Sequence, residues 1–252
     1  NVKAMFTNPE VYRYPSKDIV EARNLISEIV IIPKFLKIGR YGALGDFLCE
    51  DLGYERGKDL LEFPWDWRID PRVVAQQLGQ QIAHWRERVK EARSPITIIA
   101  HSLGCLVTRY YVDKLNGQAA VNRMVLIGGT HNGLPKALQV FNTLGKHPAI
   151  HAIAEPFQRA LASAPSVYTM LPTATSVLDA SRKPIDLYQD ENWCPEEHRE
   201  NLRNAAAFHR ELKTPSQVSG VCIFGYGMQT TTQVILENRT SSGRWDNIRY
   251  VI

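Results

Sequence analysis

Short apolar runs alternate with amphipathic segments along the first half of the chain, and this alternation restricts the fold more than any other feature of the sequence. The apolar runs have the length of β-strands and lie at residues 28–32, 59–63, 95–100 and 121–127. The segments between them carry apolar residues at helical spacing, at 39–52, at 70–89 and from 103 onward. This order predicts an α/β fold, in which a mostly parallel sheet carries helices on both faces.

Local signals place the boundaries of these elements. Asp70 followed by Pro71 predicts a helix start, because an Asp side chain caps the first turn and Pro suits the first helical position. The apolar face of this helix comprises Val74, Leu78, Ile82, Trp85 and Val89. Gly53 suits a C-terminal cap for the helix at 39–52. The run at 95–100 is continuously apolar, which predicts a strand buried on both faces.

The second half of the chain changes character. Residues 133–214 are polar, favour helices and are interrupted by prolines, so we expect a helical cap or insertion of about this extent. Strand-like sequence returns at 217–226 and at 230–236. We expect a single α/β domain over residues 1–252. Because the chain opens without Met and closes within a strand-like pattern, we expect that domain to be truncated at both ends.

The composition excludes several classes of protein. A net charge of +4 over 252 residues is mild and not clustered, so the sequence offers no basic stripe for nucleic acid. No apolar run approaches the ~20 residues that a membrane-spanning helix requires. We expect no cofactor, and the compartment and the oligomeric state stay open.

The cysteines favour reduced thiols. The chain has four, at Cys49, Cys105, Cys194 and Cys222, without a CxxC pair and without metal-type spacing to His. We therefore expect no metal site. Cys105 and Cys222 lie in apolar segments and are expected to be small core residues. One or two disulfides remain an alternative.

The sequence Ala100-His101-Ser102-Leu103-Gly104 lies between the apolar run at 95–100 and an amphipathic segment. A chain that reverses from strand to helix within about one residue strains the backbone at Ser102 and requires small residues two before and two after it. Such an elbow would hold the Ser102 hydroxyl above the sheet edge. The free N–H of Leu103, at the helix N-terminus, could then stabilise a developing oxyanion. The alternative is a chance match to a short pattern.

A serine nucleophile requires a base, and in this arrangement an acid and then a histidine follow the serine along the chain. Asp246 is the one late acid candidate, and no histidine follows His209. His131 follows the run at 121–127 and could line the site, as a base or as a structural loop residue. His101 is expected to pack or hydrogen-bond near the elbow. The remaining candidates are expected at the surface: His84, His147, His151, His198 and His209, with Asp179, Asp186 and Asp190.

Four passages resemble one known family. The first is Gly42-Ala43-Leu44 with Leu52-Gly53-Tyr54 and Gly57-Lys58-Asp59-Leu60, and the second is Phe63-Pro64-Trp65-Asp66-Trp67-Arg68. The third is the elbow. The fourth is residues 164–172 followed by Phe224-Gly225-Tyr226-Gly227 with Thr230 and Thr231. Together they are similar to the lecithin:cholesterol acyltransferase-like group of α/β hydrolases, which contains acyltransferases and phospholipases.

The resemblance implies an α/β-hydrolase fold with a mobile helical cap. It implies that Ser102 attacks an ester, carries the acyl group and passes it to an alcohol or to water. The family's catalytic Asp lies in a Gly-Asp-Gly-Thr-like turn after the segment matching 222–250, and its His lies further on. Its second oxyanion donor lies upstream of the segment matching Asn1. None of the three is in this sequence, which agrees with the expected truncation.

The aromatic-Asp-Trp-Arg passage allows two interpretations. Asp66 and Arg68 could pair and brace a loop, whereas Trp65 and Trp67 could form the wall of an acyl channel. We therefore predict a substrate-binding set of Trp65, Asp66, Trp67, Arg68, His101 and His131.

Three functional hypotheses remain open. The first is acyl transfer on lipid esters, with a lipid substrate and contact with a membrane surface as its partners. The second is a serine hydrolase of another ester or of an amide. The third is a binding module that keeps the fold without catalysis, which the missing Asp and His would favour in a complete chain.

Overall fold

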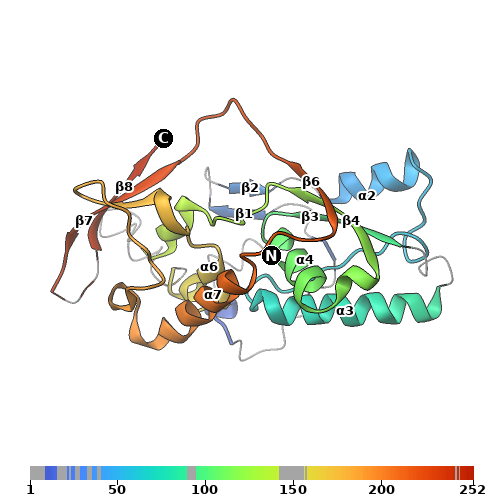
Figure 1. Ribbon diagram of the computed structural model, residues 1–252, viewed down its shortest axis with the longest axis horizontal. Helices are drawn as coiled ribbons and strands as arrows, with labels where there is room; N and C mark the ends of the chain where they lie inside the picture. Colours follow the sequence, from blue (N-terminus) through green and yellow to red (C-terminus); the bar gives the residue numbers. More distant parts are fainter. Residues whose placement is uncertain are drawn as a thin grey trace.

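The computed structural model describes residues 9–15, 22, 24–25, 29–32, 36–38, 41–89, 95–141, 156, 158–241, 243 and 245–252. The fold is a mixed α/β arrangement with a parallel sheet and flanking helices (Figure 1). The α-helices are α2 (Tyr41–Glu50), α3 (Pro71–Arg88), α4 (Leu103–Lys114), α6 (Pro165–Thr169) and α7 (Arg199–Glu211). Short 3₁₀ helices are η1 (Pro9–Tyr12), η3 (Gly117–Ala119), η4 (Pro135–Val140), η5 (Ala174–Ser176), η6 (Glu191–Trp193) and η7 (Glu196–His198). The strands are β1 (Ile29–Ile32), β2 (Leu36–Ile38), β3 (Ile96–His101), β4 (Val121–Ile127), β5 (Val177–Asp179), β6 (Ser219–Ile223), β7 (Gln233–Arg239) and β8 (Trp245–Val251).

The central sheet has the strand order β3-β4-β6, and all of its pairs are parallel. In the register, Ile99 lies opposite Val125, and Val125 lies opposite Val221. Because parallel strands bring their carboxyl ends to one edge, the residues that follow β3, β4 and β6 meet there. The predicted elbow lies at this edge.

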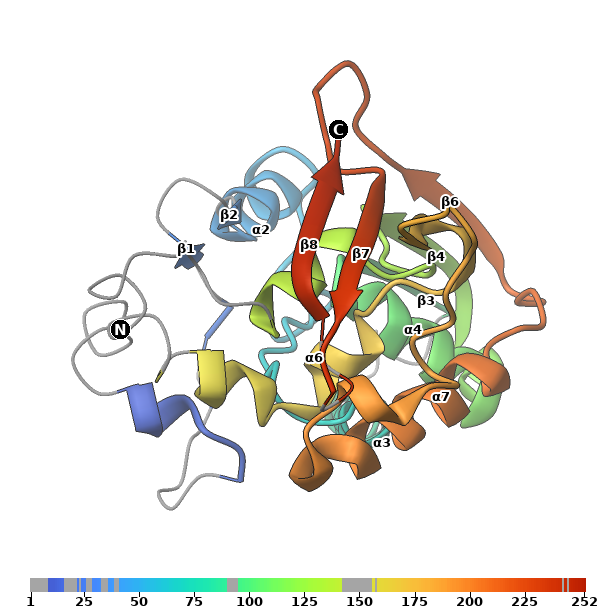
Figure 2. The same cartoon turned by 90° about the vertical axis from the view of Figure 1, so that its left-hand side faces the viewer.

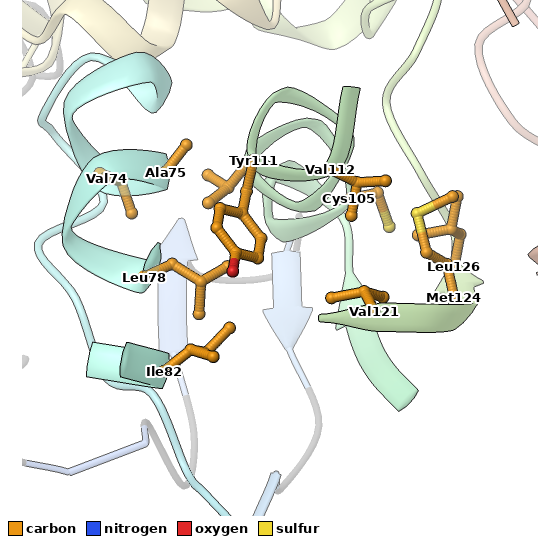
Figure 3. Close-up of a cluster of buried hydrophobic side chains, with 11 residues drawn as sticks. Val74, Ala75, Leu78, Ile82, Cys105, Tyr111, Val112, Val121, Met124 and Leu126 are labelled. Atoms are coloured by element: carbon orange, nitrogen blue, oxygen red, sulfur yellow. The ribbon is translucent and has the colours of Figure 1, made fainter. Parts of the chain in front are cut away.

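Helices α3 and α4 cover one face of the central sheet (Figure 3). Asp70 caps α3 as predicted, since its carboxylate accepts a hydrogen bond from the Arg72 N–H at 2.8 Å. The predicted apolar face points inward and is buried apart from the half-buried Val89, and Val74, Leu78 and Ile82 share a core with β4. The Tyr111 ring of α4 lies so close to Gly79 that a Cβ there would be 2.9 Å away. Burial of each large apolar side chain in such a core contributes about 1.5–3 kcal/mol to stability. This burial holds α4 against the sheet.

The opposite face of the sheet is largely open, so the prediction that β3 is buried on both faces is wrong. Ile99 is 39% exposed, and Val221 and Ile223 of β6 are 53% and 48% exposed. Helix α2 lies on this side (Figure 1) and reaches the carboxyl end of β3 through Tyr41. Cys222 is exposed on β6, an edge strand of this sheet among the described residues, so its assignment to the core is also wrong.

Other local predictions had mixed outcomes. The strand at 28–32 is confirmed as β1, and the helix at 39–52 as the shorter α2. Gly53 ends α2 with a φ of 76°, and the Tyr54 N–H donates to the Leu48 carbonyl at 3.0 Å. The strand predicted at 59–63 is wrong. Leu60 makes an isolated bridge with Arg56, and the apolar side chains that follow pack on the α3–α4 core, with no strand paired to them in the part of the chain that the structure describes.

The described residues between 133 and 214 pack with the C-terminal hairpin of β7 and β8 (Figure 2). The segment contains α6 and α7, but also β5, which pairs with β7 in a second sheet of order β5-β7-β8. A second core joins these parts and includes Tyr168, Leu171, Leu202, Val234 and Leu236. Strands β6, β7 and β8 confirm the strand-like sequence near the end of the chain. Among the helices that the structure describes, none has the length and apolarity to cross a membrane.

Candidate active site

Ser102 occupies the turn between β3 and α4 with a φ of 53° and a ψ of −122°. This conformation is rare for a residue with a Cβ and costs on the order of 1–3 kcal/mol. The surrounding backbone holds it, since the Ser102 N–H donates to the Ile127 carbonyl at 2.9 Å and the Ser102 carbonyl accepts from the Cys105 N–H at 3.0 Å. The strain expected of a nucleophile elbow is therefore present at the expected residue.

The neighbours of Ser102 explain how the turn fits. A Cβ at Gly104 would lie 3.9 Å from the Cβ of Ala100, so the two small positions face each other across the turn. Ser102 is half-buried, and its hydroxyl does not cap the helix. Leu103 is the first residue of α4, and an N–H at that position has no partner within the helix. Its side chain is buried against Leu106 and Phe208, which orients the N-terminus of α4.

His101 contacts a residue that the sequence did not indicate. Its Nδ1 lies 2.6 Å from the hydroxyl oxygen of Tyr41, the first residue of α2, and the two rings meet edge to face. Burial lowers the pKa of His101 and raises that of Tyr41, so both groups are neutral near pH 7. The expectation that His101 hydrogen-bonds near the elbow is confirmed.

His131 lies in the loop after β4, at the same edge as Ser102. Its ring lies against Gly129, where a Cβ would be 2.7 Å from Nε2 and 3.1 Å from the Cβ of Cys105. Burial lowers the pKa of His131, and the charge of Arg109 lowers it further. Within the described part of the chain, no histidine is hydrogen-bonded to the Ser102 hydroxyl. The role of His131 stays a prediction.

His209 is not the surface residue that the sequence predicted. Its Nε2 lies 3.0 Å from the Thr169 carbonyl oxygen, and its ring contacts Tyr188 and Phe208. Burial lowers its pKa, so the ring is a neutral structural group. His198 is also half-buried rather than exposed.

The other predicted surface residues have separate outcomes. His84 is exposed as expected, whereas His147 and His151 lie outside the described residues. Asp186 is exposed. Asp179 and Asp190 are half-buried, and Asp190 pairs with Arg239. Asp246 lies on β8, and its side chain is outside the described part of the structure. In the parts of the chain that the structure describes, no three His, Cys, Asp or Glu side chains are placed to hold a metal ion.

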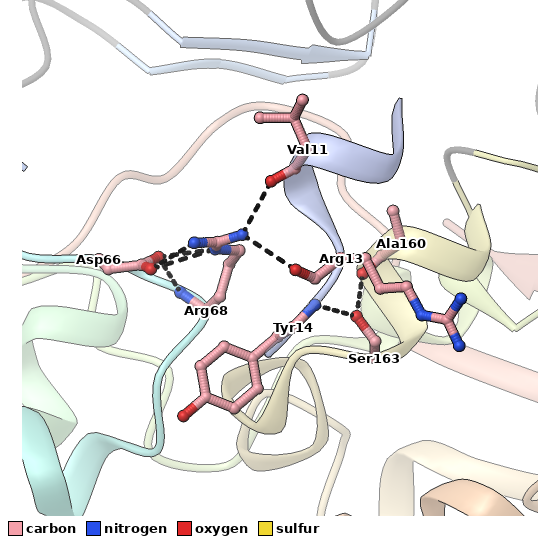
Figure 4. A network of polar contacts seen from close by, with 7 residues as sticks. All are labelled: Val11, Arg13, Tyr14, Asp66, Arg68, Ala160 and Ser163. Carbon is pink, nitrogen blue, oxygen red and sulfur yellow. Dashed lines mark hydrogen bonds and ion pairs between the residues drawn. The ribbon is translucent and has the colours of Figure 1, made fainter. Parts of the chain in front are cut away.

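Asp66 and Arg68 form the expected ion pair (Figure 4). The Arg68 side chain is 3% exposed, and its terminal nitrogen lies 2.6 Å from the Asp66 carboxylate. The same guanidinium donates to the Val11 and Arg13 carbonyls at 3.1 and 3.2 Å. The Ser166 N–H in turn donates to the Arg68 carbonyl at 3.3 Å. This network ties η1, the loop after residue 60 and α6 together, so Asp66 and Arg68 brace the loop.

The two tryptophans of the passage lie in different surroundings. Trp65 packs against the cluster that contains Leu103 and Leu106, beside the N-terminus of α4. Trp67 packs against Leu161, away from this cluster. Trp65 is thus the tryptophan that the structure brings to the helix of the candidate nucleophile.

Comparison with known proteins identifies the family. The profile described as lecithin:cholesterol acyltransferase matches residues 41–219. The chain belongs to the lecithin:cholesterol acyltransferase family. The matched range contains the Trp65–Arg68 passage, the elbow and His131, and it ends before the loop at 224–231.

Curated relatives of this family member are named lysosomal phospholipase A and acyltransferase. The dog protein (Canis lupus familiaris) is 32% identical over 98 residues, which is 36% of this chain and 23% of the relative. The human protein is 25% identical over 210 residues, which is 74% of this chain and 48% of the relative. The chain spans about half or less of the length of these relatives. A solved structure, the Tle4–Tli4 complex, aligns with a TM-score of 0.45 at 15% identity, over 68% of this chain and 46% of that one.

All four cysteines are free, as the sequence favoured. Cys105 lies under the elbow, and its thiol donates to the Ala100 carbonyl at 3.4 Å. Burial raises its pKa to about 11, which makes it a poor nucleophile near neutral pH. The candidate nucleophile of this edge is therefore the serine and not the neighbouring thiol.

Proposed function

We propose that this chain carries the nucleophile of a lipid acyl-transfer or phospholipase reaction, and that its parallel sheet and elbow are those of an α/β hydrolase. The observation that carries the proposal is the strained conformation of Ser102 at a strand-to-helix turn in a member of this family. The Ser102 oxygen attacks the ester carbonyl carbon, and the alcohol part of the ester leaves with a proton. The acyl-enzyme then transfers its acyl group to a second alcohol or to water.

The N-terminus of α4 supports stabilisation of the oxyanion. The Leu103 N–H is free of helical bonds and lies next to the attacking oxygen, where the helix dipole also favours negative charge. Loss of one such donor costs other hydrolases about 10²–10³ in rate. The proton of Ser102 must pass to a base, and we assign that role to none of the described histidines.

The surroundings of α4 support a lipid ester as the substrate. Trp65, next to Leu103, offers an apolar surface to an acyl chain. Asp66 and Arg68 support the site through the loop brace rather than through direct contact. Helix α7 packs on α4 through Phe208, and the segment 133–214 to which α7 belongs would form the cap.

An exposed apolar loop supports contact with a lipid surface. Phe224, Tyr226 and Met228 follow β6 at the carboxyl edge of the sheet and are 77%, 92% and 87% exposed. Glycines separate them, and residues 214–236 contain no charged side chain. Aromatic and apolar side chains on an uncharged loop partition into the boundary region of a bilayer. This loop would bring the edge that holds Ser102 to the lipid.

Turnover of phospholipid vesicles tests the proposal. Free fatty acid and acyl transfer to an added long-chain alcohol are measured by chromatography for the full-length protein, both unaltered and carrying Ser102→Ala or Ser181→Ala. Ser181 lies in an exposed turn and serves as the matched control. We expect Ser102→Ala to abolish both products and Ser181→Ala to leave them unchanged. Equal turnover by Ser102→Ala would reject the proposal, and vesicle binding without any turnover would favour a binding module.

A further inference from the structure

The contact between Tyr41 and His101 joins α2 to the residue before the candidate nucleophile. The two side chains are 60 positions apart in the sequence, and the Tyr41 oxygen lies 2.6 Å from Nδ1. The ring centroids are 5.6 Å apart at an interplanar angle of 63°. On the other side of the imidazole, Nε2 lies near Gly128, 3.9 Å from the position that a Cβ would take there. The ring therefore spans from α2 to the end of β4.

We propose that Tyr41 is a positioning residue for the nucleophile elbow, whose hydroxyl donates to Nδ1 of His101 and so holds the imidazole across the end of β4 with its proton on Nε2. The proposal rests on the proposed function of Ser102. In this proposal Tyr41 contacts no reacting atom. It acts only through its hydrogen bond to His101.

The strained backbone of Ser102 is the reason why the contact between Tyr41 and His101 matters. A residue in a sparsely populated backbone conformation relaxes to a more common one unless the surrounding structure holds it in place. The Ser102 N–H is fixed by the Ile127 carbonyl, and the thiol of Cys105 hydrogen-bonds to the Ala100 carbonyl. His101 lies between these two anchored positions at the end of β3, and its side chain adds a further constraint on the 101–102 peptide. Fixing the ring at Tyr41 restricts that peptide.

The protonation states agree with a phenol donor. Burial is the cause that lowers the pKa of His101, and no charged partner contributes to the shift. The titratable neighbour that acts on Tyr41 is the Cys105 thiol of α4, which Cys222 of β6 influences in turn. With the imidazole and the phenol both neutral, one donor and one acceptor must meet between them. A phenol that donates leaves Nε2–H facing Gly128, at the edge where the substrate ester would lie.

The variant Tyr41→Phe tests the proposal, because it removes the hydroxyl and keeps the ring. Tyr54→Phe is the matched control, since Tyr54 follows α2 and is 43% exposed. In ¹⁵N-histidine-labelled protein, with the His101 signal identified by its loss in His101→Asn, we expect an unprotonated Nδ1 in the unaltered protein and in Tyr54→Phe. We expect Tyr41→Phe to shift this signal towards a mixture of tautomers. A merely structural role for Tyr41 would not change the tautomer.

The second measurement is the rate at which a fluorophosphonate labels Ser102 in the full-length protein. We expect a threefold to tenfold slower rate in Tyr41→Phe, the effect of one hydrogen bond, and no change in Tyr54→Phe. An unchanged His101 tautomer overturns the proposal, and so does a changed tautomer with an unchanged labelling rate. If Ser102 is not labelled at all, the proposed function fails, while the tautomer still decides whether Tyr41 holds His101.

Discussion

Replacing Arg68 by Lys should cost the protein about 3 kcal/mol of unfolding free energy, because the pair with Asp66 is buried and Lys cannot reproduce its geometry. The Arg68 side chain is 3% exposed and that of Asp66 is 11% exposed. Lys keeps the charge but can keep only part of the guanidinium's bonds to the carboxylate and to the Val11 and Arg13 carbonyls. Breaking a buried ion pair costs about 3–5 kcal/mol. Because Lys can keep one contact with the Asp66 carboxylate, we expect the loss for Arg68→Lys to lie at the lower end of this range.

Arg249→Lys is the matched control for this experiment. Arg249 also contacts a carboxylate through two nitrogens, with Nε lying 3.1 Å from Glu237, but its side chain is 53% exposed. Exposed pairs contribute about 0–1 kcal/mol, so we expect a loss below about 1 kcal/mol. Both variants are compared by urea unfolding at neutral pH. Similar losses of unfolding free energy in the two variants would refute the claim that Asp66 and Arg68 brace the loop. A raised KM with unchanged stability in Arg68→Lys would favour the interpretation that Arg68 contacts the substrate.

Three further predictions concern the backbone, the thiols and one histidine. Gly133→Ala should cost at least about 3 kcal/mol, because φ is 74° and the new Cβ would clash with the Leu171 carbonyl oxygen. Gly53→Ala, where φ is 76° but no atom lies within 4 Å of the new Cβ, should cost about 1 kcal/mol. Equal losses in denaturant unfolding would contradict the role of the contact with Leu171. A thiol reagent should modify the exposed Cys222 rapidly and leave the buried Cys105 unmodified in folded protein, and rapid labelling of Cys105 would show that the elbow opens. Burial lowers the pKa of His209 below 6.5. As the pH falls through 6.5 the unfolded state therefore binds more protons than the folded state, and the free energy of unfolding falls. His209→Gln should flatten this part of the stability–pH curve, and an unchanged slope would be evidence against burial as the cause.

Features with local signals could be predicted from the sequence. The start of α3 follows from Asp70 and Pro71, which act within one helical turn. The elbow follows from an apolar strand, a serine between small residues and an amphipathic helix, all within a short stretch. The family assignment rests on such local passages too, which is why the resemblance stated from the sequence agrees with the family match.

Features that depend on distant residues could not be predicted. The run at 59–63 has a strand-like composition, but apolar side chains can pack on a core without a neighbouring strand, and here they do. His209 looks like a surface residue on its own helix, and it is half-buried because Tyr188 and Phe208 pack against its ring. The bond between Tyr41 and His101 crosses 60 positions and leaves no pattern in either segment. The open face of the sheet likewise depends on which elements pack beside it.

The most direct test of the account is to map the site that a fluorophosphonate labels. The protein is incubated with the probe, digested and analysed by mass spectrometry, alongside Ser102→Ala and Ser181→Ala. The account predicts the phosphonyl adduct on the peptide that contains Ser102, at equal yield in Ser181→Ala and absent from Ser102→Ala. An adduct on another residue, or a folded full-length protein that is not labelled, would contradict the claim that Ser102 is the nucleophile.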